Sequence, residues 1–328
     1  MPPVRVARRE APRCAAPAGV AAIGGLQPVD VPADAARLGQ DGPVTETSPL
    51  DQATTQRLVV LAADLAREAG DMVRRGRPRD VAVAATKTSP IDVVTAMDLA
   101  SEALIRARIA AVRPDDGILG EEQGLLPGSS GITWVIDPID GTVNYLYGIP
   151  AYAVSVAAVT GPPRPDAWTV VAGCVHSVAD GRVWTAGLGK GARCDGSPVQ
   201  VNDPVPLAQS LLGTGFGYTA DRRRGQARVV AALLPQVRDI RRIGSAALDL
   251  CTLASGGLDL YYERGLQPWD LAAASLVAQE AGALVLGLRG VPADEAMTVA
   301  GPELTVRALV ALLEDLDADR DEPADPTV

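Results

Sequence analysis

Apolar residues at helical spacing mark the first regular segment of the chain. Between Leu58 and Met72 they recur every three to four residues, or at a multiple of that spacing, which predicts a helix with one apolar face. Ser48 or Asp51 can begin this helix, because a short polar side chain accepts hydrogen bonds from the free N–H groups of a first turn. The pattern runs to about Arg75.

A second helical pattern covers residues 97–112. Arg106 and Arg108 interrupt its apolar positions, so we expect both arginines to face solvent. The residues that we expect to face the core are Met97, Leu104, Ile105, Ile109 and Val112.

The middle of the chain predicts strands, and its last third alternates strands with helices. Strands are expected at 117–119, 134–136, 152–159, 169–175 and 182–186, the last three as neighbours in one sheet. Beyond about residue 205, strands are expected at 211–213, 238–242, 259–262, 284–286 and 298–300, and helices at 222–234, 245–254, 269–281 and 303–316. This pattern predicts an α+β or α/β fold of stacked layers, with a site at the strand ends.

Composition divides the chain into four parts. Residues 1–48 are rich in Ala, Pro, Gly and Arg and predict a disordered extension. We expect residues 49–200 to form an α+β subdomain that carries most of the candidate metal ligands. Residues 201–316 are expected to form an α/β subdomain that supplies Asp270 and substrate contacts, and residues 317–328 an acidic tail that frays.

The segment 134–144 carries the clearest chemical signal. Its apolar start delivers two carboxylates, Asp137 and Asp140, three residues apart, and Gly141 then lets the chain turn. A strand that ends in two acids is suited to a hard divalent cation, because Mg²⁺ prefers carboxylates, waters and phosphate oxygens. The amides of Gly141 and Thr142 could open a helix that faces an anion.

Further acids fall at predicted strand ends or helix starts: Asp98, Glu121, Glu263 and Asp270. Taken singly, each is better explained by a helix cap or by a solvated loop or surface position. Taken together, Glu121 and Asp270 could join Asp137 and Asp140 around two or three Mg²⁺ ions, the arrangement of a two-metal hydrolase.

Composition and charge narrow the class of protein. The formal net charge is −10, which argues against a nucleic-acid surface, and no apolar run is long enough for a membrane span. Hydrophobic residues make up 47% of the chain and aromatic residues only 3%, so the core must be built from aliphatic side chains.

Two residue types that often carry phosphatase or hydrolase chemistry are poorly placed here. The four cysteines form no C-x-x-C pair and begin no C-x₅-R loop, so they predict neither a zinc site nor a cysteine phosphatase, and the default location is a reducing cytoplasm. The one histidine, His176, has no G-x-S-x-G partner and is expected to be structural.

Several motifs in this order resemble the inositol monophosphatase family. They are D-P-I-D-G-T at 137–142, G-E-E at 120–122 and W-D at 269–270, with further similarity at 87–98, 148–155, 242–247 and 261–263. The resemblance covers roughly residues 55–315, and within the family it looks closest to bacterial inositol-1-monophosphatases of actinobacterial type. It implies a layered α-β-α-β-α sandwich of the inositol monophosphatase and fructose-1,6-bisphosphatase type.

The resemblance also implies a ligand set for two to three Mg²⁺ ions. Glu121 and Asp137 would hold the first ion with the backbone carbonyl of Ile139. Asp137, Asp140 and Asp270 would hold the second. Asp98 and Glu121 would surround a third ion and its water.

The remaining roles that the resemblance implies concern water and substrate. The Thr142 hydroxyl and Asp98 would orient the attacking water near Glu121, and the amides of Gly141 and Thr142 would hold the phosphate. The residues implied at the polyol hydroxyls are Glu263, Ala246 and Ser245.

The expected function is therefore Mg²⁺-dependent hydrolysis of myo-inositol 1-phosphate by a cytoplasmic, lithium-sensitive homodimer. One alternative keeps the chemistry and changes the substrate to histidinol phosphate, fructose 1,6-bisphosphate or 3′-phosphoadenosine 5′-phosphate. A bisphosphate needs an extra basic contact, for which Arg264 or Arg241 is available. An alternative of another class is a non-catalytic interaction protein on the same fold.

Overall fold

The structure is a computed structural model that describes residues 50–78, 81–87 and 93–320. The predicted extension at 1–48, the loop at 88–90 and the tail beyond residue 320 lie outside the described residues.

An eight-stranded sheet forms the first half of the fold. Its strand order is β10-β9-β8-β7-β6-β5-β3-β4, and every neighbouring pair is antiparallel except β3 and β5. The predicted strands β6, β7 and β8 are neighbours, as expected. The bounds are β3 Gly117–Gly120, β4 Gly124–Leu126, β5 Ile132–Asp140, β6 Ala153–Thr160, β7 Thr169–Ser177, β8 Val183–Gly187, β9 Ala192–Cys194 and β10 Ser197–Pro198.

Two helices, α1 (Gln52–Gly76) and α2 (Ala96–Val112), cover one face of this sheet. Asp51 caps α1 by accepting a hydrogen bond from the Thr54 amide at 2.7 Å, as the sequence predicted. Leu58 of α1 and Ile105 of α2 meet Trp134 of β5 in one buried core. A small antiparallel pair, β1 (Val83–Thr86) and β2 (Val93–Thr95), leads into α2.

Two expectations about α2 were wrong. Val112 is 61% exposed, and it is the last residue of the helix. Arg106 does not face solvent: its guanidinium donates to Glu102 at 2.7 Å and to the Gly124 carbonyl at 2.5 Å. Arg108 does lie at the surface, paired with Glu68.

A five-stranded sheet forms the second half, with strand order β12-β11-β13-β15-β14. Its first three strands are parallel, and β15 is antiparallel to both of its neighbours. The bounds are β11 Leu211–Thr214, β12 Asp239–Arg241, β13 Leu260–Glu263, β14 Leu284–Leu286 and β15 Thr298–Gly301.

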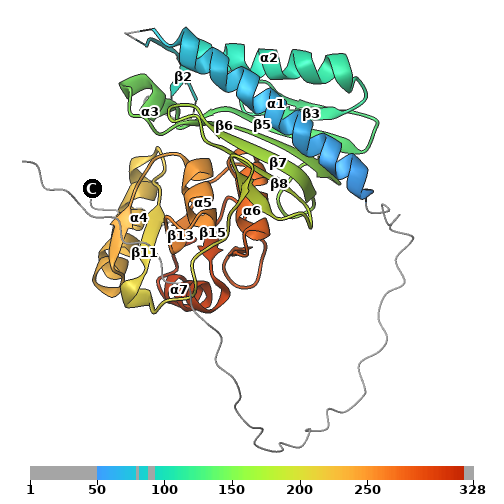
Figure 1. Cartoon of the computed structure of the whole chain (residues 1–328). Coiled ribbons are helices and arrows are strands. Elements are labelled where there is room, and N and C mark those ends of the chain that lie inside the picture. Colours follow the sequence, from blue (N-terminus) through green and yellow to red (C-terminus); the bar gives the residue numbers. More distant parts are fainter. Residues whose placement is uncertain (1–49, 79–80, 88–92, 321–328) are drawn as a thin grey trace, which may run out of the picture. The chain divides into compact units, whose positions relative to one another are not determined.

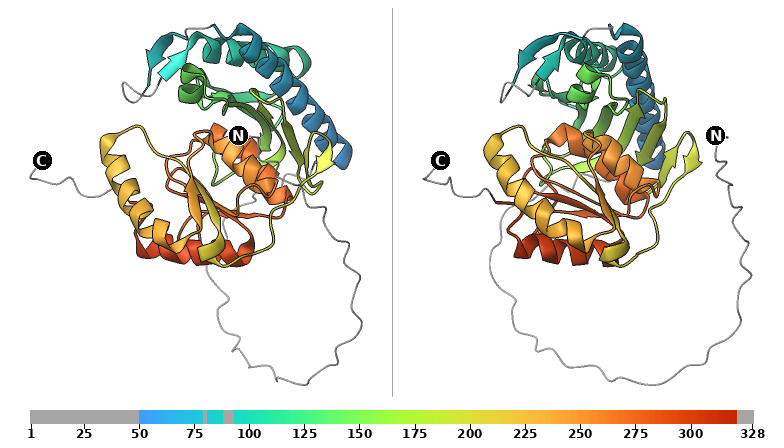
Figure 2. Two further views of the ribbon diagram at one scale, coloured as in Figure 1. Left: turned by 60° about the vertical axis from the view of Figure 1, so that its left-hand side comes forward. Right: turned by 90° about the vertical axis from the view of Figure 1, so that its left-hand side faces the viewer.

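Helices α5 (Ala246–Ala254) and α6 (Pro268–Glu280) lie between the two sheets, in orange in Figures 1 and 2. Helices α4 (Ala220–Leu233) and α7 (Glu303–Asp315) pack on the outer face of the smaller sheet. The order of layers is therefore helices, sheet, helices, sheet, helices, which confirms the predicted α-β-α-β-α sandwich.

Small residues let the central layer pack closely. Ala272, Ala273 and Ala274 of α6 are all buried, and a Cβ on Gly173 of β7 would lie 3.0 Å from the Ala273 Cα. A helix lined by alanine can approach a sheet more closely than one lined by large side chains. Small residues at this contact thus let α6, whose first turn carries Asp270, pack closely against the larger sheet.

Candidate active site

An irregularity in β5 decides where its two acids point. Side chains of a regular strand alternate, so residues three apart face opposite sides. Asp137 pairs with Ser155 and Asp140 with Ala153, so that β5 advances three residues while β6 advances two. This one-residue bulge contains Pro138, a residue that a bulge tolerates. It turns Asp137 and Asp140 toward the same side.

Asp270 meets this pair from the start of α6. One of its oxygens, Oδ2, accepts a hydrogen bond from the Gln267 amide at 2.7 Å and so caps the helix. The Ser155 hydroxyl donates to the Trp269 carbonyl at 3.3 Å, which ties the helix start to β6. As a result, one oxygen from each of Asp137, Asp140 and Asp270 lies within 4.8 Å of the others.

Without a cation, three ionised carboxylates at this separation repel one another and destabilise the folded chain. Asp137 is 1% exposed, and burial, followed by the charges of Glu121, Asp140 and Asp270, raises its pKa well above the usual range. Burial, followed by Asp140 and Glu121, does the same to the pKa of Asp270. Burial and like charge both oppose ionisation, so the cluster favours either protons or a divalent ion with oxygen ligands.

Glu121 extends the cluster from the end of β3. Its carboxyl group hydrogen-bonds to that of Asp137, and burial raises its pKa to about 7, against the opposing effect of Lys87. The Lys87 ammonium lies 2.7 Å from an oxygen of Glu121 and 2.7 Å from one of Glu122. Lys87 is therefore a positive charge at the Glu121 edge of the cluster.

A buried glutamate that the sequence did not single out holds this loop. Glu102 of α2 accepts hydrogen bonds from the amides of Glu122 at 2.8 Å and Gln123 at 3.0 Å. Position 120 must be glycine, because a Cβ on Gly120 would lie 2.4 Å from the Glu102 carboxylate. Arg106 neutralises the Glu102 charge, which explains why that arginine is not at the surface.

Asp98 and Thr142 form the other edge of the cluster. Asp98 Oδ2 caps α2 by accepting from the Thr95 amide at 2.8 Å, and its Oδ1 lies 3.1 Å from the Thr142 hydroxyl. That hydroxyl also lies 3.0 Å from the Ile139 carbonyl, so its single proton can go to one of the two acceptors at a time. Burial raises the pKa of Asp98.

Gly141 begins α3 (Thr142–Tyr147) in the left-handed region, with φ 94°. A side chain there would be strained, and its Cβ would lie 2.9 Å from the Ala151 carbonyl and 3.1 Å from the Gly244 carbonyl. Glycine is therefore required both for the turn and for the close approach of the segment before α5.

The residues expected at the polyol hydroxyls lie around Asp140. The Ser245 hydroxyl and the Ala247 amide donate to Asp140 Oδ2 at 2.5 and 2.7 Å, and the Ala246 amide lies beside the same carboxylate. In this structure Ser245 thus holds Asp140 and caps α5. Glu263 accepts from the Tyr261 hydroxyl at 2.7 Å, and burial raises the pKa of Glu263 to about 7.

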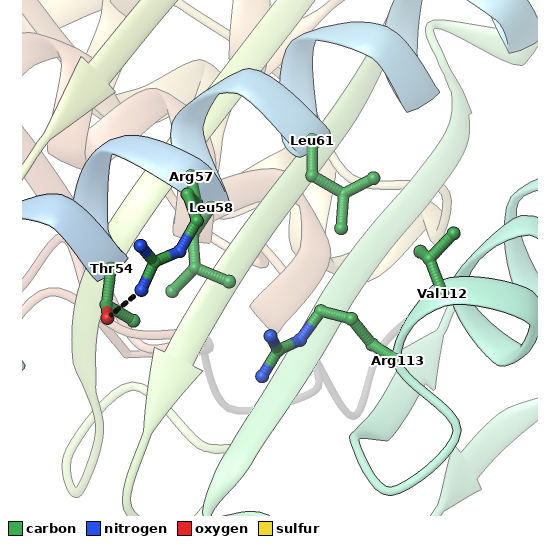
Figure 3. A pocket seen from close by; sticks show the side chains of 6 residues that line it. All are labelled: Thr54, Arg57, Leu58, Leu61, Val112 and Arg113. Atoms are coloured by element: carbon green, nitrogen blue, oxygen red, sulfur yellow. Dashed lines mark hydrogen bonds between the residues drawn. The ribbon is translucent and has the colours of Figure 1, made fainter.

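The cavity drawn in Figure 3 is unrelated to these acids. It has a volume of about 240 Å³ and lies between the start of α1 and the end of α2. Its lining residues are Thr54, Arg57, Leu58, Leu61, Val112 and Arg113.

His176 has a structural contact, as expected, because its ring is hydrogen-bonded to the Ala66 carbonyl at 3.0 Å. Within the described residues, no helix has both the length and the apolar character that a bilayer crossing needs.

The structure combines a five-layered fold with a cluster of carboxylates suited to a metal ion. Comparison with known proteins identifies the family that has these features. The model of the inositol monophosphatase family matches residues 55–316, and the chain belongs to that family. It is an enzyme, a phosphatase of this family, as its relatives are named.

Two relatives and one solved structure illustrate the similarity. The chain is 48% identical over 256 residues to inositol-1-monophosphatase SuhB of Mycobacterium tuberculosis, covering 70% of this chain and 83% of that protein. It is 46% identical over 271 residues to inositol-1-monophosphatase of Mycobacterium leprae, covering 79% and 87%. The solved structure of Mycobacterium tuberculosis SuhB aligns with a TM-score of 0.68 at 42% identity, covering 81% of this chain and 99% of that one.

Proposed function

We propose that this phosphatase hydrolyses myo-inositol 1-phosphate to myo-inositol and phosphate in the presence of Mg²⁺. The observation that carries the proposal is the convergence of Asp137, Asp140 and Asp270 within 4.8 Å. The names of the mycobacterial relatives, inositol-1-monophosphatases, support the choice of substrate.

The donor set fits Mg²⁺ better than a softer metal. The clustered ligands are carboxylates, with no cysteine or histidine among them, and Mg²⁺ is a hard cation that takes oxygen ligands. We assign two to three ions to Glu121, Asp137, Asp140 and Asp270, together with the Ile139 carbonyl and Asp98. When bound, such ions activate water and offset charge on the phosphate oxygens.

The residues of the chain have separate tasks in this proposal. When the Thr142 hydroxyl donates to Asp98, its oxygen is left free to accept a hydrogen bond from the attacking water and so to orient that water. We also assign Glu121 to the attacking water, as the family resemblance implies. We assign the Gly141 and Thr142 amides to the phosphate, and Glu263 with Ala246 and Ser245 to the polyol.

A substrate panel tests the choice of substrate. We expect purified protein in Mg²⁺ to release phosphate from myo-inositol 1-phosphate with a kcat/KM at least about tenfold above those for histidinol phosphate, fructose 1,6-bisphosphate and 3′-phosphoadenosine 5′-phosphate, a discrimination worth about 1.4 kcal/mol. Malachite-green detection of phosphate measures each rate. A histidinol phosphate rate well above the inositol phosphate rate would overturn this choice.

A thermal melt separates the enzyme from a non-catalytic interaction protein. We expect Mg²⁺ at 100 times its Kd to stabilise the protein by about 2.7 kcal/mol, because only the folded chain gathers the acids. The gain should be larger at pH 8 than at pH 5, since protons compete for carboxyls whose pKa values are raised, such as Glu121 at about 7. A melting temperature unaffected by Mg²⁺ at pH 8 favours the interaction protein.

Three further properties complete the proposal. Lithium should inhibit by taking one Mg²⁺ position, which a titration of Li⁺ against Mg²⁺ measures. A homodimer is expected by family resemblance. A cytoplasmic location is supported by Cys174, Cys194 and Cys251, which are all free.

A further inference from the structure

One side of helix α2 is buried although its side chains are polar. Asp98, Ser101 and Glu102 are all 0% exposed, and their spacing of i, i+3 and i+4 places them on the same side of the helix. A helix normally buries apolar residues, because a buried polar group costs free energy unless it is hydrogen-bonded. The hydrogen-bond partners of these three side chains therefore indicate what this side of the helix does.

Each of the three side chains contacts a different segment of the candidate site. Asp98 lies 3.1 Å from a hydroxyl at the start of α3. Ser101 donates to the Pro138 carbonyl at 3.2 Å, inside the bulge of β5. Glu102 binds the turn between β3 and β4, residues 121–123. Helix α2 thus connects three segments that carry acids of the site.

Glu102 holds two of the three amides in the turn between β3 and β4. The Glu122 and Gln123 amides donate to its two carboxylate oxygens at 2.8 and 3.0 Å, and neither amide has another acceptor among the described residues. The remaining amide, that of Glu121, donates to the Ile136 carbonyl at 3.3 Å. One buried carboxylate therefore fixes most of the turn that carries the Glu121 side chain.

Arg106 in turn fixes the Glu102 carboxylate. Its guanidinium donates to Glu102 at 2.7 Å and to the Gly124 carbonyl at 2.5 Å, so it connects α2 to the residue that follows the turn. Hydrogen bonds between an arginine and a carboxylate are short and strong, because both groups are charged. Gly120 leaves room for this carboxylate directly beside the backbone that precedes Glu121.

We propose that Glu102 is a positioning residue of the metal site, which sets the direction of the Glu121 carboxylate through the backbone amides of the turn. The inference rests on the proposed function, because it concerns the Mg²⁺ ions that we assign to Glu121. Removal of a group that orients a metal ligand typically weakens metal affinity by about 10–100-fold. Glu102 acts through the backbone, whereas the Lys87 ammonium contacts the Glu121 carboxylate itself.

Mg²⁺ affinity in the absence of substrate tests this role. In Glu102→Gln, the new side chain can accept from one amide of the turn but turns its own donors toward the other, and Arg106 loses its charged partner. We expect the Kd for Mg²⁺ at pH 8, measured by isothermal titration calorimetry, to rise about tenfold or more. At saturating Mg²⁺, the KM for myo-inositol 1-phosphate should change less than about twofold.

Glu68→Gln is the matched control, because Glu68 also pairs with an arginine of α2, Arg108, but does so at the surface. It should leave the Kd for Mg²⁺ unchanged. Glu102→Asp keeps the charge opposite Arg106 but shortens the side chain, so that its carboxylate no longer reaches both amides. It should raise the Kd at least about threefold, and it decides the question if Glu102→Gln does not fold.

A Kd within about twofold of the wild-type value in Glu102→Gln, or in Glu102→Asp if only that variant folds, overturns the role. A lower melting temperature in EDTA with such an unchanged Kd would make Glu102 a residue of structural importance only.

Failure of the proposed function gives a different pattern. A wild type that binds no Mg²⁺ contradicts the proposed function and the role of Glu102 together. A wild type that binds Mg²⁺ but does not hydrolyse myo-inositol 1-phosphate contradicts the choice of substrate alone, and the comparison of Kd values still decides the role of Glu102.

Discussion

Asp137→Asn is expected to abolish turnover and at the same time to stabilise the metal-free protein. Asp137 is the acid on which the charges of Glu121, Asp140 and Asp270 all act. Asparagine keeps the shape of the side chain but removes the charge that a metal needs, so we expect kcat to fall by at least about 10³-fold. In EDTA the same change relieves repulsion, and the melting temperature should rise by about 2 °C or more.

The opposite directions of the two effects are what identifies a metal ligand. A residue needed only for folding would lower both activity and the stability of the metal-free protein. Asp64→Asn serves as the control, because Asp64 is an exposed aspartate on α1, and it should leave both measurements unchanged. Calorimetry with and without Mg²⁺ and a phosphate-release assay give the two readouts. Normal turnover by Asp137→Asn would rule out the proposed chemistry.

The fold could be predicted largely because its elements follow local rules. Asp51 and Ser245 begin α1 and α5 as predicted, since each satisfies backbone donors within its own turn. The failed prediction for Arg106 depended in part on a partner outside its own helix. Periodicity placed Arg106 outside, but the Gly124 carbonyl and Glu102 draw it inward.

In the candidate site, too, features set by local sequence were predicted and features set by distant contacts were not. The sequence pointed to acids at strand ends and helix starts, and Asp98 and Asp270 lie there. Each uses one oxygen to cap its helix, which confirms the capping interpretation and leaves the other oxygen for the site role that we propose. The bulge in β5, the Lys87 contact and the support from Glu102 were not predicted, because each depends on pairing between segments far apart in the chain.

The second large effect concerns Asp249, a buried acid of α5 without a ligand role in the proposal. It is 1% exposed, and its Oδ1 has no hydrogen-bond partner among the described residues. Burial, followed by the charges of Glu263 and Asp140, raises its pKa from 3.8 to about 9. A buried polar atom without a partner is rare in folded proteins, and here it destabilises the chain.

The sign of the pH dependence follows from the direction of this shift. Between pH 4 and 9 the folded chain keeps the proton of Asp249 and the unfolded chain releases it, so stability falls as pH rises through this window. At 1.36 kcal/mol per pH unit, the loss amounts to about 5 kcal/mol at pH 7.5. Below pH 4 both states are protonated and the loss disappears.

The effect of Asp249→Asn on the free energy of unfolding should therefore change sign with pH. The amide never ionises, but its buried donors lack partners, which costs about 1–2 kcal/mol. In EDTA the variant should be less stable than the wild type by up to about 1 kcal/mol at pH 4.5, where the wild type has already lost about 1 kcal/mol, and more stable by about 3 kcal/mol at pH 7.5. Urea unfolding at the two pH values measures both differences.

An acid whose carboxylate has hydrogen-bond partners serves as the control for this experiment. Asp259 accepts hydrogen bonds from the Leu211 amide at 2.7 Å and from Asn202 at 2.8 Å, so Asp259→Asn should be destabilising at both pH values. The difference between Asp249 and Asp259 isolates the missing partner, because both changes replace a carboxylate by an amide within the same half of the fold. If Asp249→Asn destabilises equally at pH 4.5 and 7.5, Asp249 is ionised in the folded protein, and a cation must then lie close enough to offset its charge.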